Sequence, residues 1–153
     1  FDRVDEEYLE KPRRWEIADI RRFMFYIGPV SSIFDYALFA IMWFYFSANS
    51  LAHESFFQTG WFVESILSQH LIVHVIRTGK VPFIQSRPSN PLLMTTIGIC
   101  VVGAILPYTS LAAGIDMVAL PLSYWYGMTI IIIAYLVTTQ LIKTLLIKRF
   151  GLI

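Results

Sequence analysis

One apolar stretch of the chain, residues 60–77, carries the side chains whose types could do chemistry. Its sequence is GWFVESILSQHLIVHVIR, and its polar members include Glu64, Gln69, His70 and His74. The stretch is apolar enough to cross a bilayer, where each of these groups is costly unless it faces a partner or a water-filled path. The stretch is therefore the candidate functional helix.

Helix geometry separates the two candidates for a cation contact on this stretch. Each residue of an α-helix turns by about 100°, so Glu64 and Gln69, five positions apart, lie about 140° from each other. One undistorted helix cannot aim both at the same ion, so at most one belongs to a single central site, unless the helix is distorted or the other acts at an entrance. An earlier apolar stretch carries Asp35 near its middle. Asp35 is either a cation ligand or, the favoured interpretation, an acid hydrogen-bonded to a neighbouring helix.

The two histidines have the spacing of metal ligands on one helix face. His70 and His74 are four residues apart, as in some zinc sites. Membrane di-iron oxidases and desaturases have a similar pattern, but they need many more histidines, and this chain has only His53 besides. We expect His70 and His74 to be hydrogen-bonding residues between helices, and a histidine-metal membrane enzyme is a lesser hypothesis.

The composition places the chain among membrane proteins. Of its 153 residues, 56% are hydrophobic and only 15% are charged, which is too apolar for an ordinary soluble domain. Cys100 is the only cysteine, so no disulfide can form within the chain. The chain begins at Phe1 rather than at a methionine, and we expect it to be a piece of something longer.

Four apolar segments are long enough to be transmembrane helices. A juxtamembrane arm, residues 1–22, comes first and mixes acids with bases. The third segment is short and carries small residues, among them Gly98 and Gly103, that let a neighbouring helix approach closely. The four expected spans cover about residues 23–46, 57–76, 92–106 and 122–147.

The distribution of positive charge predicts the orientation of the spans. All Lys and Arg residues fall within residues 3–22, 77–87 and 143–149, and the loops 47–58 and 107–121 have none. Since cytoplasmic loops are rich in Lys and Arg, we expect four antiparallel, up-down spans with both termini in the cytoplasm.

Two polar features of the last span have structural interpretations. Lys143 is close enough to the end of the span for its ammonium group to reach the lipid headgroups, and we favour this over a buried ion pair. The run Thr138-Thr139-Gln140 is expected to bond to a neighbouring helix rather than to a substrate.

Several short strings of the chain are specific to one family. The most specific are LSQHLIVHVIRT and PFIQSR, within residues 60–91, and the strings VDEE, KPRRW, RRFMFYIGPVSSIFD and ALPLSY occur in the rest of the chain. Through these strings the chain resembles, over essentially its whole length, the C-terminal transmembrane domain of bacterial magnesium-transporting P-type ATPases. The resemblance implies that the four spans are helices seven to ten of such a pump, located in the bacterial inner membrane.

The resemblance also implies a function. Such pumps couple ATP hydrolysis to the import of Mg2+, which is the transported ion and the counter-ion of ATP, and the partners of this domain are the other membrane helices and cytoplasmic domains of the same pump. The chain contains neither a DKTG nor a TGES string and should be inactive alone. Gln69 falls where related pumps place an acid or amide that contributes to the cation site, while Glu64 and Asp35 are weaker candidates.

A second hypothesis needs no pump. The chain could be a self-contained four-span membrane protein that binds a partner or forms an oligomer, with the arm 1–22 as its docking segment. That hypothesis predicts stable, homogeneous particles of the isolated chain in detergent. A pump fragment would instead be an incomplete bundle with polar faces that lack partners.

Overall fold

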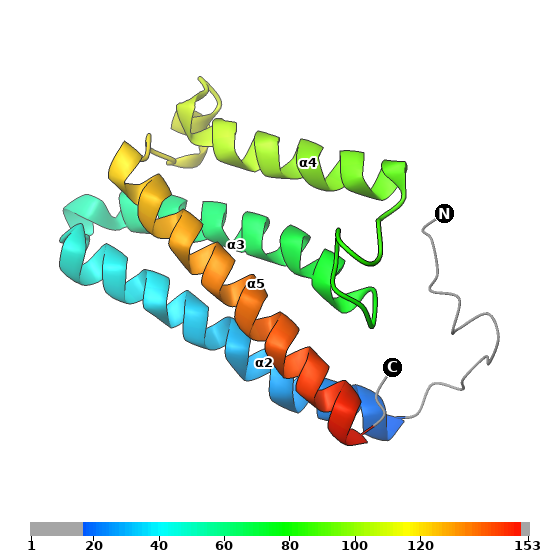
Figure 1. Cartoon of the computed structure of the whole chain (residues 1–153). Coiled ribbons are helices and arrows are strands. Elements are labelled where there is room, and N and C mark those ends of the chain that lie inside the picture. Colours follow the sequence, from blue (N-terminus) through cyan, green and yellow to red (C-terminus); the bar gives the residue numbers. More distant parts are fainter. Residues whose placement is uncertain (1–16, 151–153) are drawn as a thin grey trace.

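The computed structural model describes residues 17–150 and shows a helical protein (Figure 1). Most of the expected juxtamembrane arm lies outside the described residues, and residues 17–22 form the first turns of a helix. Apart from one isolated bridge, the described residues contain no β-structure, which confirms the predicted all-α class. The four long helices are α2 (Ile17–Ala40), α3 (Glu54–Ile76), α4 (Asn90–Ile105) and α5 (Leu122–Phe150).

Short helical turns connect and extend the long helices. α2 continues into a π-helical turn, and three 3-10 turns lie at the same end of the molecule. α4 begins where Ser89 caps it, because the Ser89 hydroxyl accepts a hydrogen bond from the Leu92 amide at 3.4 Å and Pro91 follows in the first turn. The short elements are η1 (Ile41–Tyr45), η2 (Leu51–His53), η3 (Leu106–Tyr108) and η4 (Ala112–Ile115).

Three helical segments of the described chain are long and apolar enough to cross a membrane. They are Ile20–Tyr45, Asn90–Tyr108 and Leu122–Arg149. α3 has a comparable length of 23 residues, but its acids, amides and histidines lower its hydropathy. A fourth crossing by α3 therefore stays a prediction.

The helices α2, α3 and α5 pack against one another, and α4 packs mainly on α3 (Figure 1). α2 and α5 run in opposite directions, because Ile27 lies in one cluster with Leu146 while Leu38 lies in another with Ile131. α3 runs in the same direction as α5. Each helix therefore opposes its immediate neighbours in the sequence.

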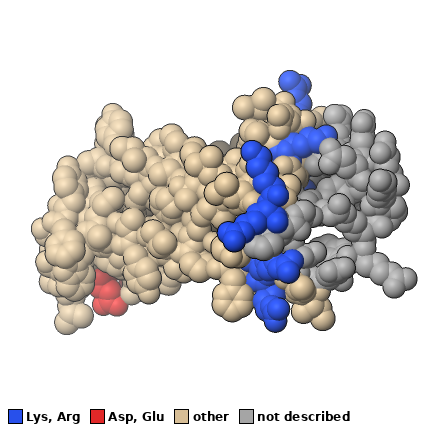
Figure 2. All heavy atoms as spheres, turned by 60° about the horizontal axis from the view of Figure 1, so that its bottom comes forward, with Lys and Arg blue, Asp and Glu red and all other residues tan. Residues whose placement is uncertain are grey.

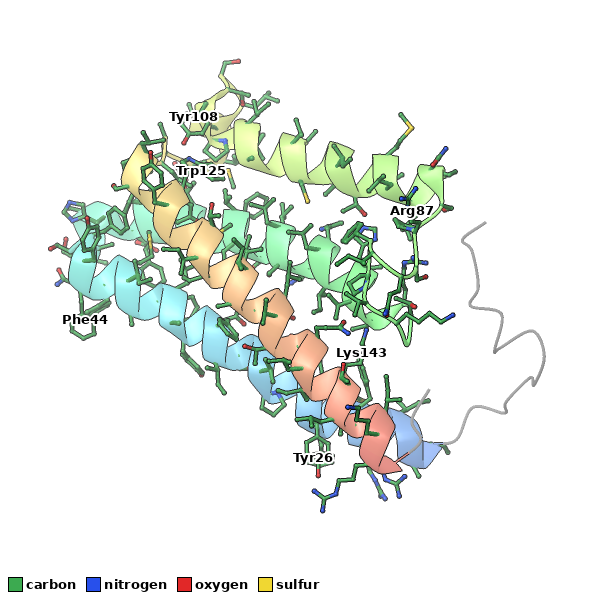
Figure 3. The ribbon with its side chains drawn as sticks, in the orientation of Figure 1. Tyr26, Phe44, Arg87, Tyr108, Trp125 and Lys143 are labelled. Carbon is green, nitrogen blue, oxygen red and sulfur yellow. The ribbon has the colours of Figure 1, made fainter. Side chains whose placement is uncertain are left out.

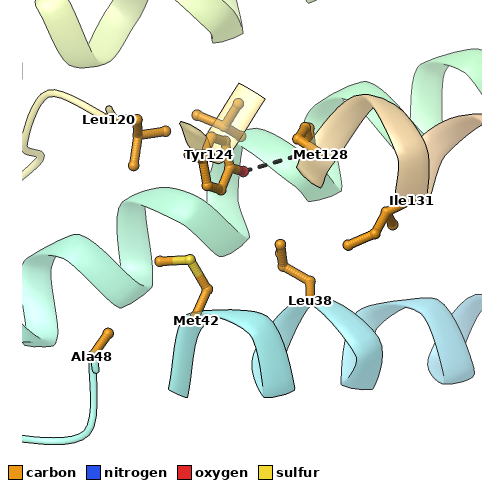
Figure 4. Packing of buried hydrophobic residues seen from close by; sticks show 8 residues of the cluster. Leu38, Met42, Ala48, Leu120, Tyr124, Met128 and Ile131 are labelled. Carbon is orange, nitrogen blue, oxygen red and sulfur yellow. Dashed lines mark hydrogen bonds between the residues drawn. The ribbon is translucent and has the colours of Figure 1, made fainter. Parts of the chain in front are cut away.

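The main hydrophobic core lies where α2, α3 and α5 meet, near the end that carries η1 (Figure 4). Tyr124 of α5 is buried at its centre, and its hydroxyl donates a hydrogen bond to the Gly60 carbonyl of α3 at 2.5 Å. A side chain at Gly60 would meet the Met42 methyl at 2.7 Å, so glycine lets the three helices come this close. The buried members are Leu38, Met42, Ala48, Val63, Leu120, Tyr124, Met128 and Ile131.

Charged residues gather at the ends of the bundle (Figure 2). The exposed Lys and Arg side chains lie together at one end, and acidic side chains lie at the opposite end. The basic end holds the start of α2, the end of α3, the start of α4 and the end of α5. The middle of the bundle presents an uncharged surface on the face shown, as lipid contact requires.

Gly103 sets the distance between α3 and α4. A Cβ added there would lie 2.8 Å from Ile66 Cγ2 on α3, whereas one added at Gly98 would meet nothing within 4 Å. Of these two glycines expected to permit close helix approach, the structure therefore assigns that role to Gly103. Ile66 is β-branched, so its methyl group cannot move away freely.

We predict that Gly103→Ala weakens the packing of α4 on α3 by about 1–3 kcal/mol, because an overpacked contact forces the helices apart. Hydrogen exchange of α4 amides in the detergent-solubilised protein should become faster. The matched variant Gly98→Ala should leave this exchange unchanged or slower. Equal exchange in the two variants would contradict the assignment.

Candidate functional site

Gln69 lies on the side of α3 that the other described helices leave open. Its side chain is exposed, together with the apolar side chains of Phe62, Val73 and Ile76 on the same side of the helix. It makes no hydrogen bond with any residue that the structure describes. In a membrane, an amide in this position needs a polar partner, because lipid cannot form hydrogen bonds with it.

Glu64 faces the opposite way, into the bundle. Its side chain is 1% exposed, and its carboxyl group interacts with the half-buried Asp35 carboxyl of α2 and with Ser68. Tyr135 of α5 lies beside the two acids, and its hydroxyl interacts with Ser31 of α2. The structure thus brings Glu64 and Asp35 together and keeps Gln69 apart from both.

This arrangement agrees with the helical angle expected between Glu64 and Gln69. Glu64 is buried within the described residues, and Gln69 is exposed. The neighbour of Asp35 is likewise a side chain of an adjacent helix. The juxtaposition of the two acids could not be found from either helix alone.

Both histidines make hydrogen-bonding contacts with other described residues. His74 is fully buried, its Nε2 lies 3.0 Å from Thr96 Oγ1 of α4, and its ring contacts Phe83 with centroids 4.9 Å apart. His70 Nδ1 lies 2.7 Å from the Ile66 carbonyl of its own helix. No group of three His, Cys, Asp or Glu side chains in the described part is arranged to hold a metal ion. His74 therefore links two helices, whereas His70 bonds within α3.

Lys143 does not reach the lipid headgroups, so that expectation was wrong. Its side chain is only 3% exposed and points from α5 toward the end of α3 (Figure 3). Its Nζ donates hydrogen bonds to three backbone carbonyl oxygens, of Val75 at 2.8 Å, Thr78 at 2.9 Å and Lys80 at 3.0 Å. The Val75 carbonyl lies in the last turn of α3, whose carbonyls carry partial negative charge, and Thr78 and Lys80 belong to the loop that follows. The buried ammonium group is stabilised by all three carbonyls.

The loop after α3 is folded around this contact. Arg77 Nη2 donates to both the carbonyl and the hydroxyl oxygen of Ser86, at 3.1 and 3.2 Å. The amide of Val81 donates to the Gln85 side chain at 2.9 Å. The basic loop between α3 and α4 thus has a defined conformation anchored by Lys143.

The polar run before Lys143 also differs from expectation. Thr139 is fully buried, but its hydroxyl oxygen has no hydrogen-bond partner among the described residues. Gln140 bonds within its own helix, to Thr144 Oγ1 at 3.4 Å. Within residues 17–150, neither Thr139 nor Gln140 forms the expected bond to a neighbouring helix.

Comparison with known proteins gives the family. The family model described as cation transporting ATPase, C-terminus, matches residues 1–145. The chain belongs to this family. It is 49% identical over 151 residues to a protein named magnesium-transporting ATPase, P-type 1, from Salmonella typhimurium strain 14028s, and 48% identical to one of the same name from Escherichia coli K12.

These matches cover 99% of the chain but only 17% of each relative. The chain therefore spans about a sixth of the length of these curated relatives and corresponds to their C-terminal part. Family membership and the three apolar helices confirm the prediction of a multi-pass inner-membrane protein.

We predict that Lys143→Met destabilises the contact between α5 and the end of α3 by about 3 kcal/mol or more, because three buried carbonyl groups lose a charged donor. Limited proteolysis of the full-length protein should then cut within residues 77–89 faster. Lys148→Met is the matched control, since Lys148 is exposed on the same helix and should have no effect. Equal cleavage of both variants would show that Lys143 is not the anchor.

Proposed function

We propose that this chain is the C-terminal membrane domain of a magnesium-importing P-type ATPase. The observation that carries the proposal is the similarity of the whole chain to the C-terminal part of magnesium-transporting ATPases. ATP hydrolysis and the main ion ligands belong to the rest of the pump, and the isolated chain should not hydrolyse ATP. Its task is to support the cation-binding helices.

The packing of α3 supports this role. One side of α3 is fixed by its own chain, through Tyr124 at Gly60, Thr96 at His74 and Lys143 at the C-terminal end. The other side carries Gln69 and remains open. The fixed side holds α3 in place while the open side is offered to the remaining helices of the pump.

The membrane orientation belongs to the same proposal. α3 crosses the membrane as well, so that α2, α3, α4 and α5 make four spans, and neighbouring spans are antiparallel. The basic end of the bundle in Figure 2 faces the cytoplasm together with both termini. The polar side chains of α3 are then covered by protein on all sides in the complete pump. Labelling of Lys80 or Arg87 from the outer side would contradict this orientation.

Gln69 contributes to the cation path through water. Mg2+ sheds its waters reluctantly and is commonly held through them by few protein oxygens. The Gln69 side-chain oxygen is an acceptor and is exposed on the open side of α3, so it can accept a hydrogen bond from a water of the hydrated ion. The Asp35–Glu64 pair faces away from this path and is not part of it.

We predict that Gln69→Ala raises the Mg2+ concentration for half-maximal ATPase activity of the full-length pump. Loss of one hydrogen bond worth about 0.5–1.5 kcal/mol corresponds to an increase of about 2–12-fold.

The matched control is Gln58→Ala on the same helix, whose side chain donates to Glu54 at 2.8 Å near the end opposite the basic loop. Its Mg2+ dependence should stay that of the wild type. An unchanged Mg2+ dependence in Gln69→Ala would make Gln69 a packing residue.

A further inference from the structure

Two carboxyl groups face each other inside the bundle, and one of them lacks a donor. Glu64 Oε2 is buried and has no hydrogen-bond partner among the described residues. The Glu64 carboxyl nevertheless interacts directly with that of Asp35, which comes from a different helix. Two ionised carboxylates offer only acceptors, so neither can satisfy the other.

The neighbouring hydroxyl groups do not supply the missing donor. The Ser68 hydroxyl interacts with the Glu64 carboxyl and with the Ser65 carbonyl, the latter at 3.3 Å, but Glu64 Oε2 still lacks a donor among the described residues. Tyr124, which lies toward the end that carries η1, donates to the Gly60 carbonyl. The Tyr135 hydroxyl lies near both acids but is hydrogen-bonded with Ser31. A buried acceptor without a donor costs free energy, so the ionised pair is unfavourable here.

A positive side chain is not available there either. On α5, the Lys143 ammonium group is held by three carbonyls and lies eight residues beyond Tyr135, about 12 Å along the helix axis. α4 contains no Asp, Glu, His, Lys or Arg. Two ionised carboxylates side by side in partly buried surroundings repel each other. Among the described groups, no positive side chain offsets this repulsion.

We propose that Asp35 and Glu64 bind one proton between them and form an intramembrane proton site of the pump. The proton comes from water, turns one carboxyl into a donor for the other, and leaves a single negative charge on the pair. Carboxyl pairs that share a site cannot both be ionised, and a shared proton is the general solution. A metal ion fits less well, because no third His, Cys, Asp or Glu side chain joins the pair in the described residues.

The proton site is separate from the surface that carries Gln69. Glu64 is buried on one side of α3, and Gln69 is exposed on another. The site therefore needs no assumption about the transported ion. Failure of the Gln69 experiment would leave the proton site standing, and failure of the proton site would leave the magnesium proposal standing.

Infrared difference spectroscopy of the purified full-length pump at neutral pH tests this site. The wild type should show the carbonyl stretch of one protonated carboxylic acid, shifted in D2O. Glu64→Gln and Asp35→Asn should each lose this band, because the introduced amide donates to the remaining carboxylate and replaces the proton. Glu54→Gln, which alters an exposed acid on the same helix, should keep it.

Glu64→Asp keeps a carboxyl group at this position. It tests the proposal even where the amide variants fail to fold. It should retain the band at a changed frequency, because the shorter side chain alters the hydrogen bond. A band identical to that of the wild type in Glu64→Gln, Asp35→Asn and Glu64→Asp would overturn the proposal. So would loss of the wild-type band when Mg2+ is added at constant pH, which would make the pair a metal site.

Discussion

Hydrocarbon cannot satisfy a hydrogen-bonding group, and α3 carries such groups on more than one side. In the proposed membrane arrangement, this constraint determines how the rest of the bundle is built. The chain covers one side of α3 with groups that match it: the Tyr124 hydroxyl meets the Gly60 carbonyl, Thr96 meets His74, and Lys143 meets the last carbonyls. Each contact joins α3 to a different part of the chain or a different level of the bundle. Together they fix its position.

The other helices have simpler roles. α2 and α5 are long apolar helices that pack on the buried side of α3. The core in Figure 4 lies where these three helices meet. α4 is attached through the close approach at Gly103 and the His74–Thr96 bond. Large apolar side chains remain exposed on all three, as expected of surfaces that meet lipid or other helices. In the proposed function, the domain is a scaffold that offers the open side of α3, with Gln69, to the rest of the pump.

Apolar length and charge distribution were sufficient to predict the class of fold, because the cost of placing polar groups in lipid leaves few alternatives. The same signals could not predict which way the polar side chains of α3 face. Glu64 and Gln69 lie on different sides of α3. The hydrophobic pattern of the helix alone does not show which of the two side chains faces the bundle. That choice depends on Asp35 and Tyr135, which other helices supply.

Lys143 shows a second limit. Its nearness to the end of α5 suggested that it reaches the headgroups, yet it continues the buried stripe formed by Tyr135 and Thr139 at intervals of four residues. The spacing was visible in the sequence, but its partners were not, because they are backbone carbonyls more than sixty residues away. Backbone groups at a helix end leave no mark on side-chain composition.

The central claim is that α3 is held by this chain on one side and covered by the remaining pump on the other. Spin labelling at Gln69→Cys, in a background where Cys100→Ser removes the native thiol, tests it most directly. We predict a label that is immobile and shielded from lipid-soluble quenchers in the full-length pump, and mobile and accessible in the isolated chain. A label that meets lipid equally in both would contradict the account.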